Sequence, residues 1–153
     1  MRGFGGRQIA VAESQLKLET ADNLSGKTVG VASQSTHYNW LQENVPDAIL
    51  RIYPNDPDMF KEAELERIDA LVTDTPVILA GSAAGESLVL CGEPLYYENA
   101  SFTLAQGGAD WRAVLNECIE TMHSSGSLEE KSVLWNNGLD LTVPPPAELD
   151  LQL

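Results

Sequence analysis

The sequence has few basic residues and no long apolar run, and both shortages exclude classes of protein. Nine Lys and Arg stand against 23 Asp and Glu in 153 residues, which gives a formal net charge of −14. An acidic surface repels phosphate backbones and anionic lipid head groups, so we expect no nucleic-acid partner and no membrane-surface binding. Solubility and adaptation to high salt both account for the acidity. No stretch approaches the roughly 18 apolar residues of a membrane span, so we expect no membrane insertion.

Cysteine, histidine and the common catalytic motifs are also scarce or absent. Cys91 and Cys118 belong to no CxxC or Cys/His pattern, so we expect two buried free thiols, with a disulfide as the alternative. His123 lies near the end of a predicted helix, where a cation suits the helix dipole. The sequence shows no nucleophile elbow, zinc-protease, P-loop or dinucleotide-binding motif. We therefore expect no enzyme, no cofactor and no metal site.

Apolar runs of strand type alternate with helical patterns along the rest of the chain. Hydrophobic residues make up 43% of the sequence, which is typical of a globular domain. The alternation favours an α/β fold with a parallel sheet. The predicted strands cover residues 7–12, 28–32, 49–54, 68–74, 87–92 and 101–105, and the predicted helices cover 35–44, 56–67, 75–81, 110–125 and 128–135. Asp56 is the predicted N-cap of the second helix.

The helix at 110–125 carries the clearest pattern. Its apolar residues recur at i, i+3, i+4, i+7, i+8 and i+11 from Trp111 to Met122, and Gly126 can end it. An apolar stripe of this kind that stays uncovered should drive self-association, so a homo-oligomer is a possible assembly. The tail at 139–153 contains three consecutive prolines and is expected to be extended or disordered.

Three small hydroxyl residues follow the predicted strand 28–32. Ser33, Ser35 and Thr36 lie where a helix should begin, so their hydroxyls join the free N–H groups of the first turn. In open α/β sheets, ligands bind beyond the carboxyl ends of the strands, and these donors suit a carboxylate. Plain N-capping, which stabilises a helix by about 1 kcal/mol, accounts for the same residues.

Asp74 closes the predicted strand 68–74 and should also lie at a carboxyl end. A carboxylate near anion-binding donors complements a zwitterion, with the α-ammonium at Asp74 and the α-carboxylate at the helix start. Capping of the helix that begins at Thr75 is the alternative role for Asp74. Taken together, the two positions favour a site for an amino acid or a similar small polar solute.

Six short motifs then follow one another in an order typical of one protein family. They are LSGKTVGV, SQSTHYNWL, RIDALVTD, CGEPLYYEN, ADWRAVLNE and KSVLWNNG. In this order they resemble family 3 of the extracellular solute-binding proteins, the polar amino-acid binders that serve ABC importers. The resemblance runs from about residue 6 to residue 138. It implies a type II periplasmic-binding-protein-like fold, in which α/β lobes with mostly parallel sheets are joined by hinge strands and close on the ligand.

The resemblance also implies roles for single residues. Ser35 and Thr36 match the Thr-Thr pair that holds the ligand α-carboxylate in the family, and Asp74 matches the acid that binds the α-ammonium. Gln34 stands where the family usually has glycine beside the carboxylate. His37 is expected to face the mouth of the cleft. No catalytic residue, metal ligand or cofactor is implied.

The same resemblance divides the chain and suggests its partners. It implies a hinge strand at 1–12, ligand-binding lobe two at 13–85, a return hinge with C-terminal helices at 86–138 and a tail at 139–153, with most of lobe one absent. The implied partners are an amino acid and an ABC transporter permease. The implied location is periplasmic or extracellular, although MRGFGGRQIAVAE shows no signal-peptide h-region. A ligand-independent interaction or sensor module, and an enzyme of the dehydratase or lytic-transglycosylase type, are the alternatives on this fold.

Overall fold

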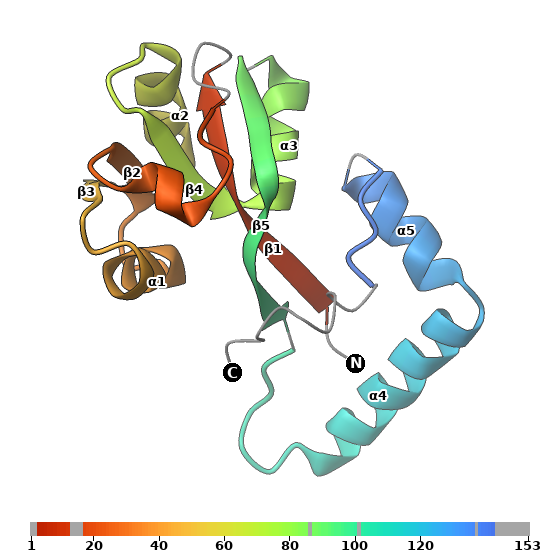
Figure 1. Ribbon diagram of the computed structural model, residues 1–153. Helices are drawn as coiled ribbons and strands as arrows, with labels where there is room; N and C mark the ends of the chain where they lie inside the picture. The colour runs from red at the N-terminus through yellow and green to blue at the C-terminus, as the bar shows by residue number, and fades with distance from the viewer. Residues whose placement is uncertain (1–2, 13–16, 86, 101, 137, 143–153) are drawn as a thin grey trace. The chain divides into compact units, whose positions relative to one another are not determined.

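The computed structural model describes residues 3–12, 17–85, 87–100, 102–136 and 138–142. These residues belong to two compact units, one of residues 6–96 and one of residues 1–5 with 97–153. The long strands β1 (Gly3–Ala12) and β5 (Leu88–Ala100) each run from one unit into the other. Most of the sheet lies in the first unit, and the two C-terminal helices lie in the second (Figure 1).

The sheet has five strands in the order β3-β2-β4-β1-β5. β2 (Thr28–Ala32) lies parallel to both β3 (Ile49–Tyr53) and β4 (Ala70–Asp74), whereas β1 lies antiparallel to β4. The predicted α/β sheet is therefore confirmed, with β1 as an antiparallel member. β3 is an edge strand, and two of its apolar side chains, Ile49 and Ile52, are exposed.

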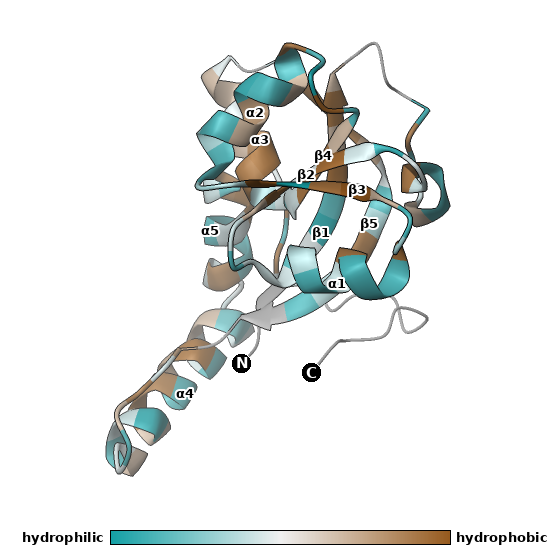
Figure 2. Cartoon of the chain, turned by 90° about the vertical axis from the view of Figure 1, so that its left-hand side faces the viewer, coloured by the Kyte–Doolittle hydropathy of each residue, from teal (hydrophilic) through white to brown (hydrophobic). Residues whose placement is uncertain are grey.

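Helices cover both faces of this sheet in the unit of residues 6–96. The helix α1 (Thr36–Asn44) and the 3₁₀ turn η2 (Ala21–Leu24) pack on one face, and α2 (Asp56–Glu64) and α3 (Thr75–Ala84) pack on the other. Each face of the sheet has its own hydrophobic core. The sequence of β4 is almost continuously apolar because Ala70 and Val72 enter the core on the α1 face and Leu71 enters the core on the α2 face. In Figure 2, β2 and β4 are accordingly largely brown.

Gly30 allows the close approach of α2 to the sheet. A Cβ atom at this position of β2 would lie 2.7 Å from Cδ1 of Ile68 and 2.9 Å from Cγ of Met59. Both of those side chains are buried in the second core, so a larger residue would force them apart. The glycine thus lets the side chains of Met59 and Ile68 pack against the middle of β2.

Two sequence predictions in this unit are wrong in detail. Asn55, not Asp56, is the N-cap of α2, since its Oδ1 accepts the N–H of Asp58 at 2.9 Å. The Asp56 carboxylate instead accepts the hydroxyl of Thr73 at 3.0 Å. The strand predicted at 87–92 extends to Ala100 as β5, and the described residues of the strand predicted at 101–105, residues 102–105, are not in a strand. The strand thus continues past Gly92, and β5 lies beside β1 in the sheet.

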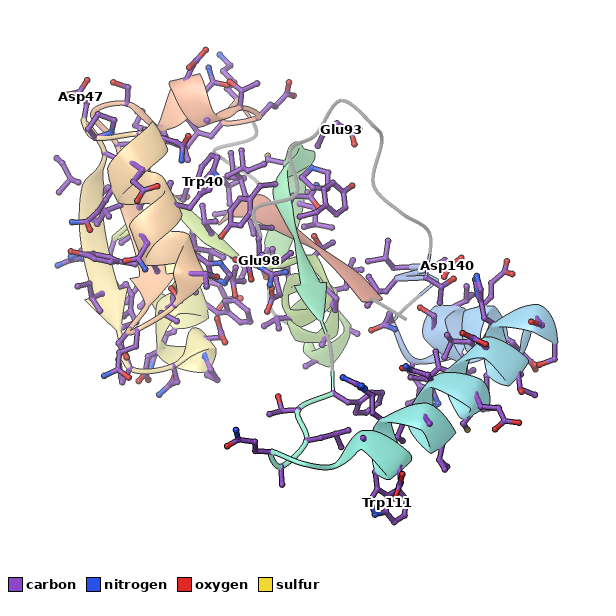
Figure 3. The ribbon with its side chains drawn as sticks, turned by 90° about the horizontal axis from the view of Figure 1, so that it is seen from below. Trp40, Asp47, Glu93, Glu98, Trp111 and Asp140 are labelled. Carbon is purple, nitrogen blue, oxygen red and sulfur yellow. The ribbon has the colours of Figure 1, made fainter. Side chains whose placement is uncertain are left out.

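The C-terminal unit contains α4 (Ala109–Ser124) and α5 (Ser127–Trp135), both as predicted. Gly126 joins them with φ 74°. Neither helix has a buried residue, and Trp111 is 67% exposed and projects outward from α4 (Figure 3). Cys118 is therefore exposed, which corrects the prediction of two buried thiols, whereas Cys91 is buried and free as predicted. Most of the predicted tail, at 143–153, lies outside the described residues.

Candidate functional site

The carboxyl ends of two neighbouring strands lie at one edge of the sheet. β2 and β4 are parallel, with Gly30 opposite Leu71, so both strands run toward the same edge (Figure 1). β2 ends at Ala32, just before α1, and β4 ends at Asp74, just before α3. The structure thus brings the segment with the hydroxyl residues and Asp74 to the same edge.

Ser35 caps α1. Its hydroxyl oxygen accepts the N–H of Tyr38 at 3.4 Å, and the hydroxyl donates to the carbonyl oxygen of Ala32 at 2.7 Å. Both bonds lie within the turn, so the Ser35 hydroxyl holds the end of β2 to the first turn of the helix. Thr36 is the first helical residue, is exposed and makes no side-chain hydrogen bond to the other described residues. The exposed hydroxyl of Thr36 is thus a candidate donor to a ligand, whereas the amide of Tyr38 is already bonded to Ser35.

Gln34 adopts a left-handed backbone conformation at this turn. Its φ is 58°, and the residue is exposed. L-residues rarely take such angles because Cβ comes too close to the carbonyl oxygen, whereas glycine takes them readily. The turn geometry therefore gives a physical reason for the glycine that the family resemblance places here.

His37 is buried, and the expectation that it faces the cleft mouth is wrong. The side chain is 6% exposed, and its Nδ1 lies 3.1 Å from the hydroxyl oxygen of Tyr96 on β5. Trp40 stacks on the same tyrosine ring, with centroids 4.9 Å apart (Figure 3). His37 lies one turn before the buried Leu41, on the same inward face of α1. This spacing of four residues was the signal in the sequence that His37 is buried. His37 thus fastens α1 to β5.

Asp74 is paired with an arginine that the sequence analysis did not single out. Arg7 of β1 stands directly opposite Asp74 of β4 in the antiparallel register. Its Nη1 lies 2.6 Å from Oδ1 of Asp74, and the side chains are 13% and 39% exposed. At this distance the two side chains form an ion pair. Oδ1 is buried and meets no hydrogen-bond criterion with any partner, so the contact is an ion pair without an aligned hydrogen bond. The one signal in the sequence was a charge inside an otherwise apolar strand.

Asp74 does not cap α3 with its side chain. It is the N-cap residue by position, but its carboxylate makes no capping hydrogen bond. The second helical residue is Pro76, which has no N–H, so one of the two usual donors to such a cap is missing. The alternative role considered for Asp74 is therefore wrong for this structure, and the carboxylate remains partly open to solvent.

A buried polar cluster supports the ion pair from below. Oγ1 of Thr75 lies 3.0 Å from the carbonyl oxygen of Gly6 and 3.2 Å from Oε1 of Gln8, so its single hydroxyl proton is shared between these two acceptors. Nε2 of Gln8 in turn donates to the carbonyl oxygen of Gly92 on β5. Thr75 and Gln8 are 6% and 7% exposed. The cluster ties β1, β5 and the start of α3 together directly beside Arg7 and Asp74.

The remaining described residues offer little other chemistry. They contain no group of three or more His, Cys, Asp and Glu side chains that could hold a metal ion. Over the same residues, no helix has the length and hydropathy needed to cross a bilayer. A shallow hollow of about 640 Å³ is lined by Glu19, Thr20, Ala21, Gly92, Glu93, Pro94 and Leu95, none of which belongs to the edge described above.

Comparison with known proteins relates the chain to amino-acid binders. It is 31% identical to the L-cystine-binding protein TcyJ of Escherichia coli (strain K12) over 126 residues, which cover 82% of the chain and 47% of that protein. It is 30% identical to the probable amino-acid-binding protein YxeM of Bacillus subtilis over 145 residues, or 92% of the chain and 54% of that protein. The chain thus spans about half the length of these curated relatives. No family model matches the sequence.

Solved structures show the same fold. A mutant of ArgBP from T. maritima superposes with a TM-score of 0.73 at 23% identity, covering 86% of this chain and 58% of that one. An ancestral cationic amino acid solute binding protein gives a TM-score of 0.72 at 25% identity, covering 89% and 59%. The fold is therefore the type II periplasmic-binding-protein-like fold that the sequence predicts. By sequence, the chain is similar over most of its own length to amino-acid-binding proteins, one of them named as an ABC transporter-binding protein, and it matches about half of their length.

Proposed function

We propose that the unit of residues 6–96 supplies one side of an amino-acid-binding site, in the substrate-binding component of an ABC importer. The ligand is bound and released without chemical change. The location is the periplasm or the outer face of the cell, and an ABC transporter permease is the partner. The relatives named for binding cystine and other amino acids support this proposal.

The observation that carries the proposal is the opposite polarity of two strand ends at one edge. The start of α1 presents amide donors and the partial positive charge of the helix dipole. The neighbouring parallel strand ends in the carboxylate of Asp74, which no helix cap occupies. An α-amino acid carries a carboxylate and an ammonium group on one carbon, so it complements such a pair of charges.

In this proposal each predicted site residue has a separate task. Asp74 accepts the α-ammonium group of the ligand. Thr36 donates to the α-carboxylate through its hydroxyl and its amide, and the Ser35 hydroxyl holds that turn in shape by accepting the amide of Tyr38. Gln34 sets the backbone of the turn. His37 takes no part in ligand contact because it is buried against Tyr96.

A thermal-shift screen tests the proposal, on protein whose mass in solution has been determined first. The common amino acids are used at millimolar concentration, with L-cystine and L-arginine included because relatives are named for them. A ligand at about 100 times its dissociation constant stabilises the folded protein by roughly 2.7 kcal/mol, a shift of several degrees. We expect such a shift for at least one amino acid.

The Asp74→Asn variant should lose that shift. Removing one charged hydrogen-bond partner costs about 1.5–3 kcal/mol, or roughly 10- to 100-fold in affinity. Asp69→Asn is the matched control, because Asp69 lies just before β4 at its opposite end and binds the N–H of Thr28 at 2.8 Å. No shift with any amino acid, in a stable oligomer, would contradict the proposal and favour an interaction module. Turnover of an added substrate would favour an enzyme.

A further inference from the structure

The ion pair between Arg7 and Asp74 joins Nη1 of the arginine to Oδ1 of the carboxylate. Oδ1, which faces Nη1 of Arg7, is itself buried, whereas the side chain of Asp74 as a whole is 39% exposed. The solvent-accessible surface of this side chain therefore belongs to its other atoms. A carboxylate has about four acceptor sites on its two oxygens, so one guanidinium contact leaves room for a second cation.

We propose that Arg7 is a positioning and specificity-determining residue of the amino-acid site. It holds Oδ1, turns Oδ2 toward the α-ammonium group of the ligand, and offsets part of the charge of Asp74 so that zwitterions are preferred to simple amines. This inference rests on the proposed function. Nothing in the family resemblance assigned a role to this position.

The first argument is that Asp74 has a competing conformation close at hand. It is the N-cap residue of α3, and the amide of Val77, the third helical residue, is a donor that an aspartate in this place ordinarily takes. The carboxylate makes no such bond here. Arg7, fixed by the strand pairing of β1 with β4, is the described cation that holds the carboxylate away from the helix.

The anchoring of Arg7 strengthens this argument. Its neighbours Gly6 and Gln8 both accept from the buried hydroxyl of Thr75, so β1 cannot slide relative to the start of α3. The Arg7 side chain is 13% exposed and thus has few alternative rotamers in solvent. An arginine on a fixed strand restrains its partner better than one on a loop, because the arginine loses less conformational entropy when the ion pair forms.

The second argument concerns charge. Arg7 and Asp74 together carry no formal net charge, and the α-carboxylate of an amino acid compensates the α-ammonium group that it brings to the site. An amine without a carboxylate adds an uncompensated positive charge beside the guanidinium, and like charges at short range repel. Without Arg7, the carboxylate of Asp74 would carry its full charge and attract such amines.

Titration calorimetry with paired probes tests the inference. The pairs are L-arginine with agmatine and L-cystine with cystamine, so each amino acid is compared with its decarboxylated amine. In Arg7→Met, we expect affinity for the amino acid to fall about tenfold and the ratio of amino-acid to amine affinity to fall at least as much. Arg7→Lys keeps the cation and should recover most of the ratio.

Arg67→Met is the matched control, because Arg67 also forms an ion pair, at 2.8 Å with Glu62, away from this edge. It should leave both affinities unchanged. A second readout needs no ligand: in Arg7→Met the freed carboxylate should cap α3, shift the Val77 amide resonance and slow its hydrogen exchange. Circular dichroism confirms that each variant is folded.

The outcomes separate the inference from the proposed function. If the wild-type protein binds no amino acid, the proposed function fails and this inference fails with it. If the wild type binds but Arg7→Met keeps the same affinity ratio, only the role of Arg7 is refuted. Tighter amino-acid binding by Arg7→Met would show that Arg7 competes with the ligand and would also overturn the inference, as would an unchanged Val77 amide.

Discussion

Replacing Gln34 by glycine should stabilise the protein without changing its fold. Gln34 has φ 58°, where the Cβ of an L-residue crowds the carbonyl oxygen at a cost of about 1–2 kcal/mol. Glycine avoids this crowding but loses more backbone entropy on folding, by about 0.5–1 kcal/mol relative to alanine. The side chain is exposed, so little packing is lost. The net gain of glycine over alanine at this position is therefore about 1 kcal/mol.

Urea unfolding followed by circular dichroism measures this difference. The comparison is between Gln34→Gly and Gln34→Ala, because alanine removes the side chain but keeps the Cβ atom that causes the strain. We expect the midpoint of the glycine variant to lie higher at an unchanged slope, which marks a change in stability alone. In a thermal scan the same ~1 kcal/mol corresponds to about 2–4 °C for a chain of this length.

One result would refute the reasoning. If Gln34→Gly is no more stable than Gln34→Ala, the turn carries no strain, and the left-handed conformation does not explain the glycine of the family. The ligand screen adds a second check. Because the variant restores the residue type that the resemblance places beside the α-carboxylate, it should bind at least as tightly as the wild type any amino acid that the wild type binds.

Two further predictions concern the core and the thiols. Leu41 is fully buried under α1, so Leu41→Ala should lower the free energy of unfolding by about 3 kcal/mol in urea titrations, and a loss below about 1 kcal/mol would contradict its place in the core. At pH 8 a thiol reagent should modify the exposed Cys118 in the native protein, but Cys91 only after unfolding. Burial raises the pKa of Cys91, and the charge of Glu19 raises it further, so less thiolate is present; equal modification rates would contradict this.

Elements marked by local chemistry could be predicted from the sequence. β2 has its predicted bounds, because Gly26 supplies a turn with φ 70° before it and the hydroxyl residues begin a helix after it. α1 ends at Asn44, two residues before Pro46, as the restriction on the residue before proline requires. Signals of this kind depend on interactions within a few residues, so contacts with distant parts of the chain do not change them.

Contacts between distant segments could not be predicted in this way. The partner of Asp74 depends on the register of β1 against β4, and no local pattern in either strand specifies that Arg7 stands opposite. The burial of His37 depends on Tyr96, 59 residues further along. Cys118 lies on the apolar stripe of α4. Such a stripe indicates which face of a helix is suited to burial, but it does not show that another element packs on that face. The strand ends that form the candidate site could thus be predicted from the sequence, but the ion pair within it could not.

The interior position of β1 has a consequence for how this sheet folds. β1 precedes the other four strands of the sheet in the sequence, yet it lies between β4 and β5. The side chains of Gln8 and Thr75, which share a hydrogen bond, are 67 residues apart in the chain. Closing so long a loop costs little more free energy than closing one of half the length, about 0.6 kcal/mol, but it slows folding. The pairing of β1 on both of its edges is therefore complete only after β4 and β5, which follow it in the sequence, have been synthesised.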